Sequence, residues 1–327
     1  MRKILIVGFG TVGQGFFELF SEKRSLVQGL ELVEVSEIVD MKLGYTRNPP
    51  SDIVDIVKGG KMLPEKGRDV LDTIRDSDAD IVCEFTWVNM KDGEPAFSHI
   101  KEALRLGKHV ITTNKGPIAL RFNELENLTK KKDGPSLKFK GTVMAGTPSY
   151  NLLDLLPGIK VSNIRGILNG TSNFILTEMG RGRSFDESLK VAQSLGYAEA
   201  DPVMDVDGFD AALKGMILSN VIGWRDEKHS LAGMEIRGIR GLQKDAKSGG
   251  GKTKLIVSIN KDSMSVKPTE LMDDDLLSNV DGVLNALELE TDTLGKIISV
   301  GPGAGRRQTG QAALTDLVDI LRSRKKE

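Results

Sequence analysis

The sequence has 327 residues, of which 39% are hydrophobic and 28% are charged, and its formal net charge is −1. This near-neutral charge argues against broad electrostatic binding to nucleic acid or to a membrane surface, and the length predicts two subdomains. The single cysteine, Cys83, excludes an intrachain disulfide and a cysteine-based zinc site. The sequence has neither an apolar run of membrane-spanning length nor a signal-peptide pattern, so we expect a cytoplasmic protein.

The first third of the chain alternates between strand and helix patterns. Apolar, β-branched runs predict strands, and the amphipathic stretches between them predict helices. The predicted strands are 3–7, 30–39, 81–85 and 109–113, and the predicted helices are 11–26 and 95–105. Such alternation is typical of a parallel sheet with crossover helices. We therefore expect an α/β protein whose N-terminal domain is a doubly wound Rossmann sheet.

A glycine motif, Gly8-Phe-Gly-Thr-Val-Gly13, lies between the first predicted strand and the first predicted helix. In this context Gly8 makes a tight turn, Gly10 lets the backbone approach a pyrophosphate, and Gly13 lets the helix pack closely on the sheet. The N–H groups of Thr11 and Val12, at the start of the helix, would bind phosphate oxygens. The motif therefore predicts binding of NAD or NADP.

The residue that ends the second predicted strand bears on which cofactor is used. At this place the carboxylate of Asp40 would accept hydrogen bonds from both ribose hydroxyls and would repel a 2′-phosphate, which favours NAD. Lys42 and Arg47 follow closely, however, and could bind a 2′-phosphate. The sequence therefore leaves the choice between NAD and NADP open.

An apolar helix predicted over 209–222 follows a stretch rich in carboxylates. Its only charges are Asp210 and Lys214, one turn apart on one face. A lysine among Ala, Leu, Met and Ile side chains is costly unless it is paired, and burial lowers its pKa toward neutrality. Lys214 is therefore a candidate proton-transfer group. The alternative is an exposed ion pair that stabilises the helix only slightly.

The remaining predicted elements indicate a central α+β region. A strand over 137–143 follows a polar Gly-Pro stretch, a helix is predicted over 185–195, and an alternating strand over 255–259. A last helix, over 311–321, comes after the glycine cluster Gly301-Pro-Gly-Ala-Gly305.

Several of these motifs resemble those of the homoserine dehydrogenases, and the resemblance runs over nearly the whole chain. The motifs are Gly93-Glu-Pro-Ala96, Thr112-Thr-Asn-Lys-Gly-Pro117, Asn169-Gly-Thr-Ser-Asn-Phe-Ile175, the acidic stretch 195–214 and Gly301-Pro-Gly-Ala-Gly305. The resemblance implies an NAD(P)-dependent oxidoreductase that interconverts L-homoserine and L-aspartate 4-semialdehyde by hydride transfer. It further implies a role in threonine, methionine and isoleucine biosynthesis and a homodimer. Because the sequence continues only a few residues past the last predicted helix, we expect no appended regulatory domain.

The resemblance also implies roles for individual residues. Lys214 would transfer the proton, Asp210 would be its partner, and Lys115 would lie beside the nicotinamide and the substrate. The implied substrate-binding positions are Gly170, Thr171, Tyr197, Glu199 and Asp205. Beyond the glycine motif and Asp40, the implied cofactor-binding positions are Thr86, Lys115, Gly303 and Ala304. Because Gly303 and Ala304 would contact the cofactor, the end of the chain would return to the dinucleotide-binding domain. We therefore expect a dinucleotide-binding domain of residues 1–138 completed by 303–327, and a substrate-binding and dimerisation domain of residues 139–302.

One position departs from the family's pattern. Many members have a glutamate that helps backbone carbonyls, here near Val143 and Ala145, to hold a monovalent cation. This chain has Lys140 at the aligned position. Because the lysine could supply the positive charge itself, the sequence leaves open whether a monovalent cation binds near Val143 and Ala145, and it predicts no other metal site.

Two other functions remain as alternatives. One is another amino-acid dehydrogenase, of the aspartate dehydrogenase type, that acts on an amine instead of an alcohol. The other is a nonenzymatic redox sensor that binds a dinucleotide. The presence of Asp210, Lys214 and Lys115 together argues against the sensor.

Overall fold

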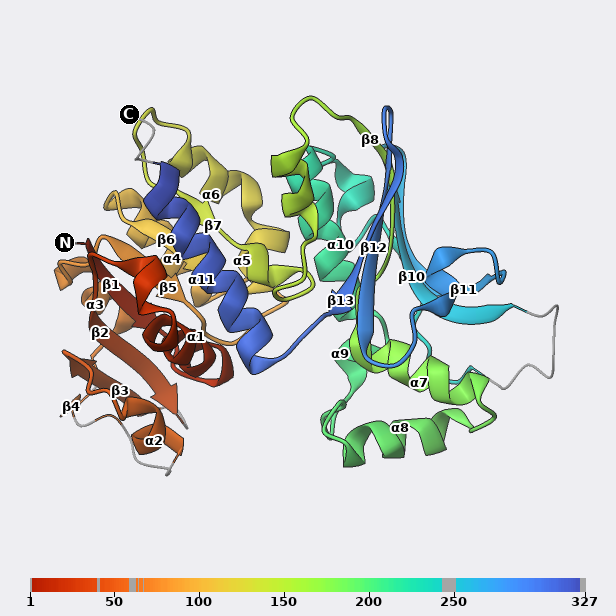
Figure 1. The fold of residues 1–327 in the computed structure, drawn as a ribbon, viewed down its shortest axis with the longest axis horizontal. Coiled ribbons are helices and arrows are strands. Elements are labelled where there is room, and N and C mark those ends of the chain that lie inside the picture. Colours follow the sequence, from red (N-terminus) through yellow and green to blue (C-terminus); the bar gives the residue numbers. More distant parts are fainter. Residues whose placement is uncertain are drawn as a thin grey trace. The chain divides into compact units, whose positions relative to one another are not determined.

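The computed structural model describes residues 2–39, 42–58, 63, 65–66, 68–242 and 251–323. The chain divides into two compact units, of which the first comprises 1–146 and 305–327 and the second 147–304 (Figure 1). The division falls at 146 and 304, a few residues after the boundaries expected at 138 and 302. The reason is that Lys140, in the stretch between 138 and 146, is bonded to Asp316 in the last helix.

The first unit is built on a sheet with the strand order β4-β3-β2-β1-β5-β6-β7. The strands are β1 (Arg2–Val7), β2 (Leu30–Val39), β3 (Lys42–Arg47), β4 (Glu65–Lys66), β5 (Ile81–Glu84), β6 (His109–Thr112) and β7 (Leu137–Lys138). Strands β2, β1, β5, β6 and β7 run parallel, which confirms the predicted α/β class. Strands β3 and β4 add an antiparallel edge. The sequence does not predict this edge because β3 lacks a clear apolar alternation.

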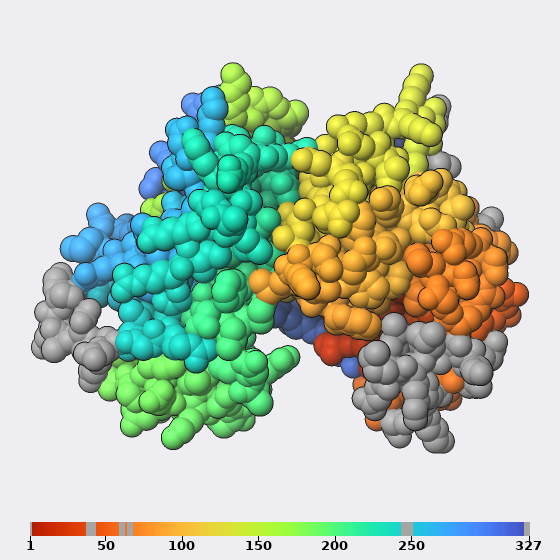
Figure 2. Space-filling model, turned by 180° about the vertical axis from the view of Figure 1, so that it is seen from behind, coloured from red at the N-terminus to blue at the C-terminus, as the bar shows by residue number. Residues whose placement is uncertain are grey.

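Helices cover both faces of this sheet. They are α1 (Thr11–Glu22), α2 (Ile53–Lys58), α3 (Val70–Asp76), α4 (Ala96–Arg105), α5 (Lys115–Leu120), α6 (Phe122–Thr129) and α11 (Arg306–Ser323). Helices α1 and α11 pack against each other on one face (Figure 1), whereas α3, α4 and α6 cover the other, drawn in orange and yellow in Figure 2. The helix predicted over 11–26 ends at Glu22, and a 3₁₀ turn follows it. The strand predicted over 137–143 is reduced to β7 and a 3₁₀ turn, Lys140–Thr142.

The last helix completes the core of the first unit. Phe16 of α1, Ile6 of β1 and Leu317 of α11 belong to one buried apolar cluster. Two glycines let the backbones of α1 and α11 approach closely. A Cβ atom on Gly15 would lie 2.3 Å from the carbonyl oxygen of Arg306, and one on Gly310 would lie 2.7 Å from the carbonyl carbon of Gly15. A larger side chain at either glycine would force the helices apart.

A buried ion pair fastens the stretch after β7 to α11. Asp316 is fully buried, accepts a hydrogen bond from the Lys140 backbone N–H at 2.9 Å, and lies 3.3 Å from the Lys140 ammonium, which also pairs with Asp319. Burial raises the pKa of Asp316 to about 6, although Lys140 opposes the rise. Burial also acts to lower the pKa of Lys140, but the carboxylates of Asp316 and Asp319 outweigh it, so this pKa is raised.

Replacing Lys140 by methionine should destabilise the protein, because Asp316 would be left buried without a counter-charge. We expect the free energy of unfolding to fall by about 3 kcal/mol at neutral pH. Since the pKa of Asp316 is higher in the folded than in the unfolded protein, protonation of Asp316 favours folding. This contribution is fully present below about pH 4 and is lost as the pH rises through about 6. Without the lysine that pKa should rise further, so the loss should be smaller near pH 5 than near pH 8.

Denaturant unfolding of Lys140→Met at these two pH values measures the difference. Asp319→Asn is the matched control, since it keeps the Lys140–Asp316 pair and should cost much less. An equal loss of stability at both pH values would contradict the assignment of the effect to Asp316.

The second unit is an α+β assembly, as predicted, around a sheet with the order β13-β12-β8-β10-β11-β9. The strands are β8 (Val161–Ile167), β9 (Glu235–Ile236), β10 (Lys252–Asn260), β11 (Ser263–Leu271), β12 (Leu284–Thr291) and β13 (Gly295–Pro302). The helices are α7 (Gly170–Gly180), α8 (Phe185–Ser194), α9 (Val203–Val206) and α10 (Phe209–Ile222). All neighbouring strands are antiparallel except β9 and β11.

Helix α10 is buried, as its apolar sequence predicts. Ten of its fourteen residues are buried, among them Asp210 and Lys214. Gly215 faces β10 and β11, since a Cβ atom there would lie 2.3 Å from the Met264 methyl carbon and 2.9 Å from a Val257 methyl carbon. This close packing places the helix on the sheet and sets the position of Lys214. Among the described residues, no helix is long and apolar enough to cross a membrane.

Candidate functional site

The glycine motif lies at the carboxyl end of β1, where the order of the sheet reverses between β1 and β5. Gly8 has a φ of +92°, and a Cβ atom on it would lie 2.6 Å from the carbonyl carbon of Phe85, just after β5. A Cβ atom on Gly13 would lie 2.3 Å from the carbonyl oxygen of Gly8. A Cβ atom on Gly10, by contrast, would meet nothing within 4 Å. Gly8 and Gly13 are therefore required by the protein itself, whereas Gly10 leaves space for a ligand at a topological switch point.

The start of α1 offers hydrogen-bond donors at the same place. The first N–H group with a helical partner is that of Gln14, which donates to the carbonyl oxygen of Gly10 at 3.0 Å. The N–H groups of Thr11, Val12 and Gly13 precede it and have no intrahelical acceptor. The first turn has no acidic residue, and Gly10 provides no side-chain cap. This combination of free N–H groups and a bare backbone can bind a phosphate group.

The carboxyl ends of β5 and β6 position Thr86 and Lys115, both half-buried. Lys115 begins α5, and the Asn114 side chain caps this helix by accepting a hydrogen bond from the Gly116 N–H at 3.2 Å. The same side chain donates to the carbonyl oxygen of Thr86 at 3.2 Å. Asn114 thus joins the loops after β5 and β6. It is a residue that the sequence analysis does not single out.

Of the three residues that bear on the adenosine ribose, only Arg47 has a described side chain. Asp40 lies outside the described residues, and so does the side chain of Lys42. Arg47 is mostly exposed and pairs with Glu34 at 3.2 Å. The choice between NAD and NADP therefore stays with the sequence.

In the second unit, Lys214 lies in a buried polar cluster. Its ammonium is 2.8 Å from Oδ2 of Asp210 and donates to the carbonyl oxygen of Leu168, after β8, at 2.6 Å. Only 7% of Lys214 is exposed, and only 9% of Asp210. Asp210 and Lys214, predicted to lie one turn apart on α10, therefore form a buried ion pair. The alternative, an exposed ion pair, is wrong.

Asn169 connects this pair to the acidic stretch. Its Nδ2 group donates to Asp210 at 2.9 Å and to Asp205 at 2.6 Å, and its Oδ1 caps α7 by accepting from the Ser172 N–H. Burial raises the pKa of Asp205, the negative charge of Asp210 adds to this rise, and the hydrogen bond from Asn169 opposes it. Asn169 is central to this cluster, although no role for it was expected from the sequence. An asparagine three residues before Ser172 at a helix start is the N-cap pattern that could have revealed it.

The other implied substrate-binding residues lie at different depths. Gly170 and Thr171 form the first turn of α7, and the Thr171 hydroxyl donates to the carbonyl oxygen of Tyr197 at 2.7 Å. The Tyr197 ring packs edge-on against Phe174 and is 43% exposed. Glu199 is exposed, and its backbone carbonyl oxygen accepts a hydrogen bond from the Gln193 side chain at 3.2 Å. The structure therefore joins Asp205, Asn169, Asp210 and Lys214 by hydrogen bonds, with Glu199 outside this cluster.

Gly303 and Ala304 lie in the connection between β13 and α11. A Cβ atom on Gly303 would lie 2.1 Å from the side chain of Asn285, so a larger residue cannot replace this glycine without a local shift. Gly303 is half-buried and Ala304 is exposed.

The stretch where the resemblance would place a cation has an unusual backbone. Met144 and Ala145 have φ values of +58° and +48°, and Val143 is fully buried. Lys140 directs its ammonium to the carboxylates of Asp316 and Asp319. Within the described ranges, no cluster of three or more His, Cys, Asp and Glu side chains could hold a metal ion.

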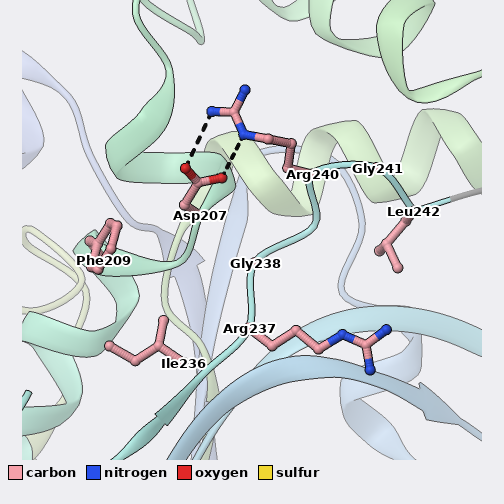
Figure 3. A pocket seen from close by; sticks show the side chains of 8 residues that line it. All are labelled: Asp207, Phe209, Ile236, Arg237, Gly238, Arg240, Gly241 and Leu242. Atoms are coloured by element: carbon pink, nitrogen blue, oxygen red, sulfur yellow. Dashed lines mark hydrogen bonds and ion pairs between the residues drawn. The ribbon is translucent and has the colours of Figure 1, made fainter. Parts of the chain in front are cut away.

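A surface pocket of about 390 Å³ is present in the second unit (Figure 3). It is lined by Asp207, Phe209, Ile236, Arg237, Gly238, Arg240, Gly241 and Leu242. The guanidinium of Arg240 forms two hydrogen bonds with the carboxylate of Asp207, at 2.8 and 3.3 Å. The pocket contains none of the residues predicted for catalysis or binding.

Comparison with known proteins gives a consistent result. The family model described as homoserine dehydrogenase matches residues 148–318. A homoserine dehydrogenase of Sulfurisphaera tokodaii is 43% identical to this chain over 322 residues, which cover 98% of the chain and 99% of that protein. An NAD(+)-dependent homoserine dehydrogenase of Pseudomonas canavaninivorans is 38% identical, with 98% and 96% covered. A solved hyperthermophilic archaeal homoserine dehydrogenase in complex with NADPH has a TM-score of 0.84 and 32% identity, with 100% and 98% covered.

Proposed function

The chain belongs to the homoserine dehydrogenase family, and from this premise we propose that it catalyses the NAD(P)-dependent interconversion of L-homoserine and L-aspartate 4-semialdehyde. The observation that carries the proposal is the buried cluster of Lys214, Asp210, Asn169 and Asp205 at the start of α7. Such a cluster combines a proton-transfer group with carboxylates that suit an amino-acid substrate.

The residues after β1 fit a dinucleotide. Gly10 has no protein atom where its Cβ would be, and it lies beside the free N–H groups of α1. The residues that would hold the cofactor are Gly8, Gly10, Thr11, Val12, Gly13, Asp40, Thr86, Lys115, Gly303 and Ala304. When bound, its nicotinamide ring would accept or supply the hydride.

Lys214 is proposed to hold and transfer the proton of the substrate hydroxyl. The acceptors of the Lys214 Nζ atom include Asp210 and the carbonyl oxygen of Leu168. These contacts hold the ammonium at the start of α7, where the substrate oxygen would bind. During alcohol oxidation the neutral amine would take the hydroxyl proton, and Asp210 would stabilise the resulting ammonium. In the reverse direction the ammonium would return the proton.

The charged groups of homoserine would bind around this lysine. Its ammonium needs carboxylates, which Asp205 and Glu199 would provide. Its carboxylate needs N–H donors, which Gly170 and Thr171 would provide at the N-terminus of α7. Tyr197 would complete the site, because its carbonyl oxygen holds the Thr171 hydroxyl. Lys115 would act beside the nicotinamide and the substrate.

Family membership supports further proposals about assembly and biological role. We propose that the second unit carries substrate binding and dimerisation, that the protein is a cytoplasmic homodimer, and that the reaction serves threonine, methionine and isoleucine biosynthesis.

A steady-state assay with homoserine and with aspartate, each with NAD and with NADP, tests the proposed function. We expect reduction of at least one cofactor with homoserine and none with aspartate. Turnover of aspartate alone would favour an aspartate dehydrogenase. Tight dinucleotide binding without turnover of either substrate would favour a redox sensor.

A further inference from the structure

A buried carboxylate lies at the end of β5, next to residues that the proposed reaction uses. Glu84 is 0% exposed. Its Oε1 atom accepts hydrogen bonds from the Thr86 backbone N–H, at 3.1 Å, and from the Thr86 hydroxyl. The Thr112 hydroxyl lies 3.2 Å from its Oε2 atom and 3.0 Å from the Glu84 backbone carbonyl oxygen, so its one proton is shared between two acceptors of the same residue. A carboxylate removed from water is costly, and an apolar residue would fill this strand position at no such cost. A buried glutamate at this position therefore indicates a role beyond packing.

The hydrogen bond to Thr86 determines what the Thr86 hydroxyl can do. A hydroxyl has a single proton, and here Glu84 Oε1 receives it. The Thr86 oxygen therefore presents only lone pairs to any bound molecule. A group that donates a hydrogen bond, such as a sugar hydroxyl, fits this surface, whereas a pure acceptor does not.

The other oxygen of Glu84 leads toward Lys115. The Thr112 hydroxyl, which donates to Glu84, accepts a hydrogen bond from the Asn114 N–H at 3.0 Å. The Asn114 side chain in turn donates to the carbonyl oxygens of Thr86 and Trp87, at 3.2 and 2.7 Å, and caps α5 through the Gly116 N–H. Glu84 is thus hydrogen-bonded to both loops, to Thr86 through its carboxylate and to the start of α5 through Thr112, which contacts both its carboxylate and its backbone carbonyl oxygen.

We propose that Glu84 is a positioning residue for the dinucleotide. It orients the Thr86 hydroxyl as an acceptor for a hydroxyl of the nicotinamide ribose, and through Thr112 and Asn114 it fixes the start of α5, where Lys115 lies. This inference rests on the proposed function, because the ribose and nicotinamide belong to the proposed cofactor.

The competing explanation is that Glu84 serves the core alone, as a partner of the buried His99. The His99 Nδ1 atom lies 3.7 Å from Glu84 Oε1, which is longer than a hydrogen bond, and it has no hydrogen-bond partner among the described residues. A purely structural role predicts that loss of the Glu84 charge changes stability and leaves the dinucleotide affinity of the folded protein unchanged.

NADPH binding followed by its fluorescence, alongside thermal melts, separates the two explanations. We expect Glu84→Gln and Thr86→Val each to raise the Kd for NADPH by roughly tenfold, the scale of one lost hydrogen bond. The double variant should lose little more than either single variant, because both act on the same contact. Thr86→Ser keeps the hydroxyl and should bind within about twofold of the wild type. The KM for homoserine at saturating NADP should change much less than Kd.

Asp316→Asn is the matched control, since it removes another fully buried carboxylate from the same unit. It should leave the Kd for NADPH unchanged. A folded Glu84→Gln protein with wild-type Kd would overturn the proposal, as would strictly additive losses in the double variant.

If Glu84→Gln does not fold, Thr86→Val and Thr86→Ser are compared instead. Equal affinities of these two variants for NADPH would overturn the proposal. If the wild type binds NADPH and oxidises homoserine, and the variants bind NADPH as tightly as the wild type, only the inference about Glu84 is contradicted. A wild type that binds no dinucleotide would contradict the proposed function as well.

Discussion

Replacing Lys214 by alanine should lower kcat for homoserine oxidation by about two to four orders of magnitude, the usual scale for the loss of a general acid or base. The expectation rests on the burial of Lys214 and on its contacts with Asp210 at 2.8 Å and with the Leu168 carbonyl oxygen at 2.6 Å. Dinucleotide binding should survive, because the glycine motif belongs to the first unit. The measurement is kcat per folded molecule, with active-site titration and NADPH binding on the same sample.

Asp210→Asn provides the companion test. It keeps the shape of the side chain but removes the charge that stabilises the Lys214 ammonium, so turnover should also fall. The double variant should lose far less than the product of the two single losses, because the pair acts as a unit. If the cluster were only structural, both substitutions would lower the melting temperature and leave turnover per folded molecule nearly intact. A folded Lys214→Ala protein with near-normal kcat would exclude Lys214 as the proton-transfer group.

Replacing Gly10 by alanine should weaken dinucleotide binding by roughly tenfold or more without reducing stability. The backbone at Gly10 has a φ of −74°, which alanine adopts without strain, and the added methyl group would meet no protein atom within 4 Å. Removal of a glycine should even stabilise the fold slightly, by restricting the unfolded chain. The methyl group would instead occupy the space in front of the free N–H groups of α1. Equilibrium binding of NADH and NADPH, compared with the melting temperature, tests this expectation.

Gly13→Ala is the informative contrast on the same turn. Its methyl group would lie 2.3 Å from the carbonyl oxygen of Gly8, so the helix would have to move away from the strand. We therefore expect Gly13→Ala to lose stability and dinucleotide binding together. If Gly10→Ala bound both cofactors as tightly as the wild type, the phosphates would not be bound at this turn.

Local patterns in the sequence were sufficient to predict the parts of the protein that depend on neighbouring residues. The β1–Gly8–α1 turn is one example, because a strand, three spaced glycines and a helix are contiguous. The Asp210–Lys214 pair is another, because one helical turn places the two side chains together wherever the helix lies. The apolar composition of α10 was likewise enough to predict its burial.

Contacts between distant segments were decided only by the tertiary structure. Asn169 lies 36 residues from Asp205 and 41 from Asp210, and Leu168 lies 46 residues from Lys214, so no spacing rule connects them. In the sequence, Glu84 is one residue of a predicted apolar strand. The pairing of β5 with β6 places Thr112 beside it, and this contact could not be predicted from the strand alone.

The packing of α11 on α1 joins residues about 290 positions apart, so it cannot be predicted from the local sequence either. The physical reason is the same in each case. The sequence by itself determines backbone preferences and the spacing of side chains within an element, through sterics and periodicity. Which buried polar group finds which partner depends on the order of strands in the sheet and on the close approach of helices, and these are properties of the whole fold.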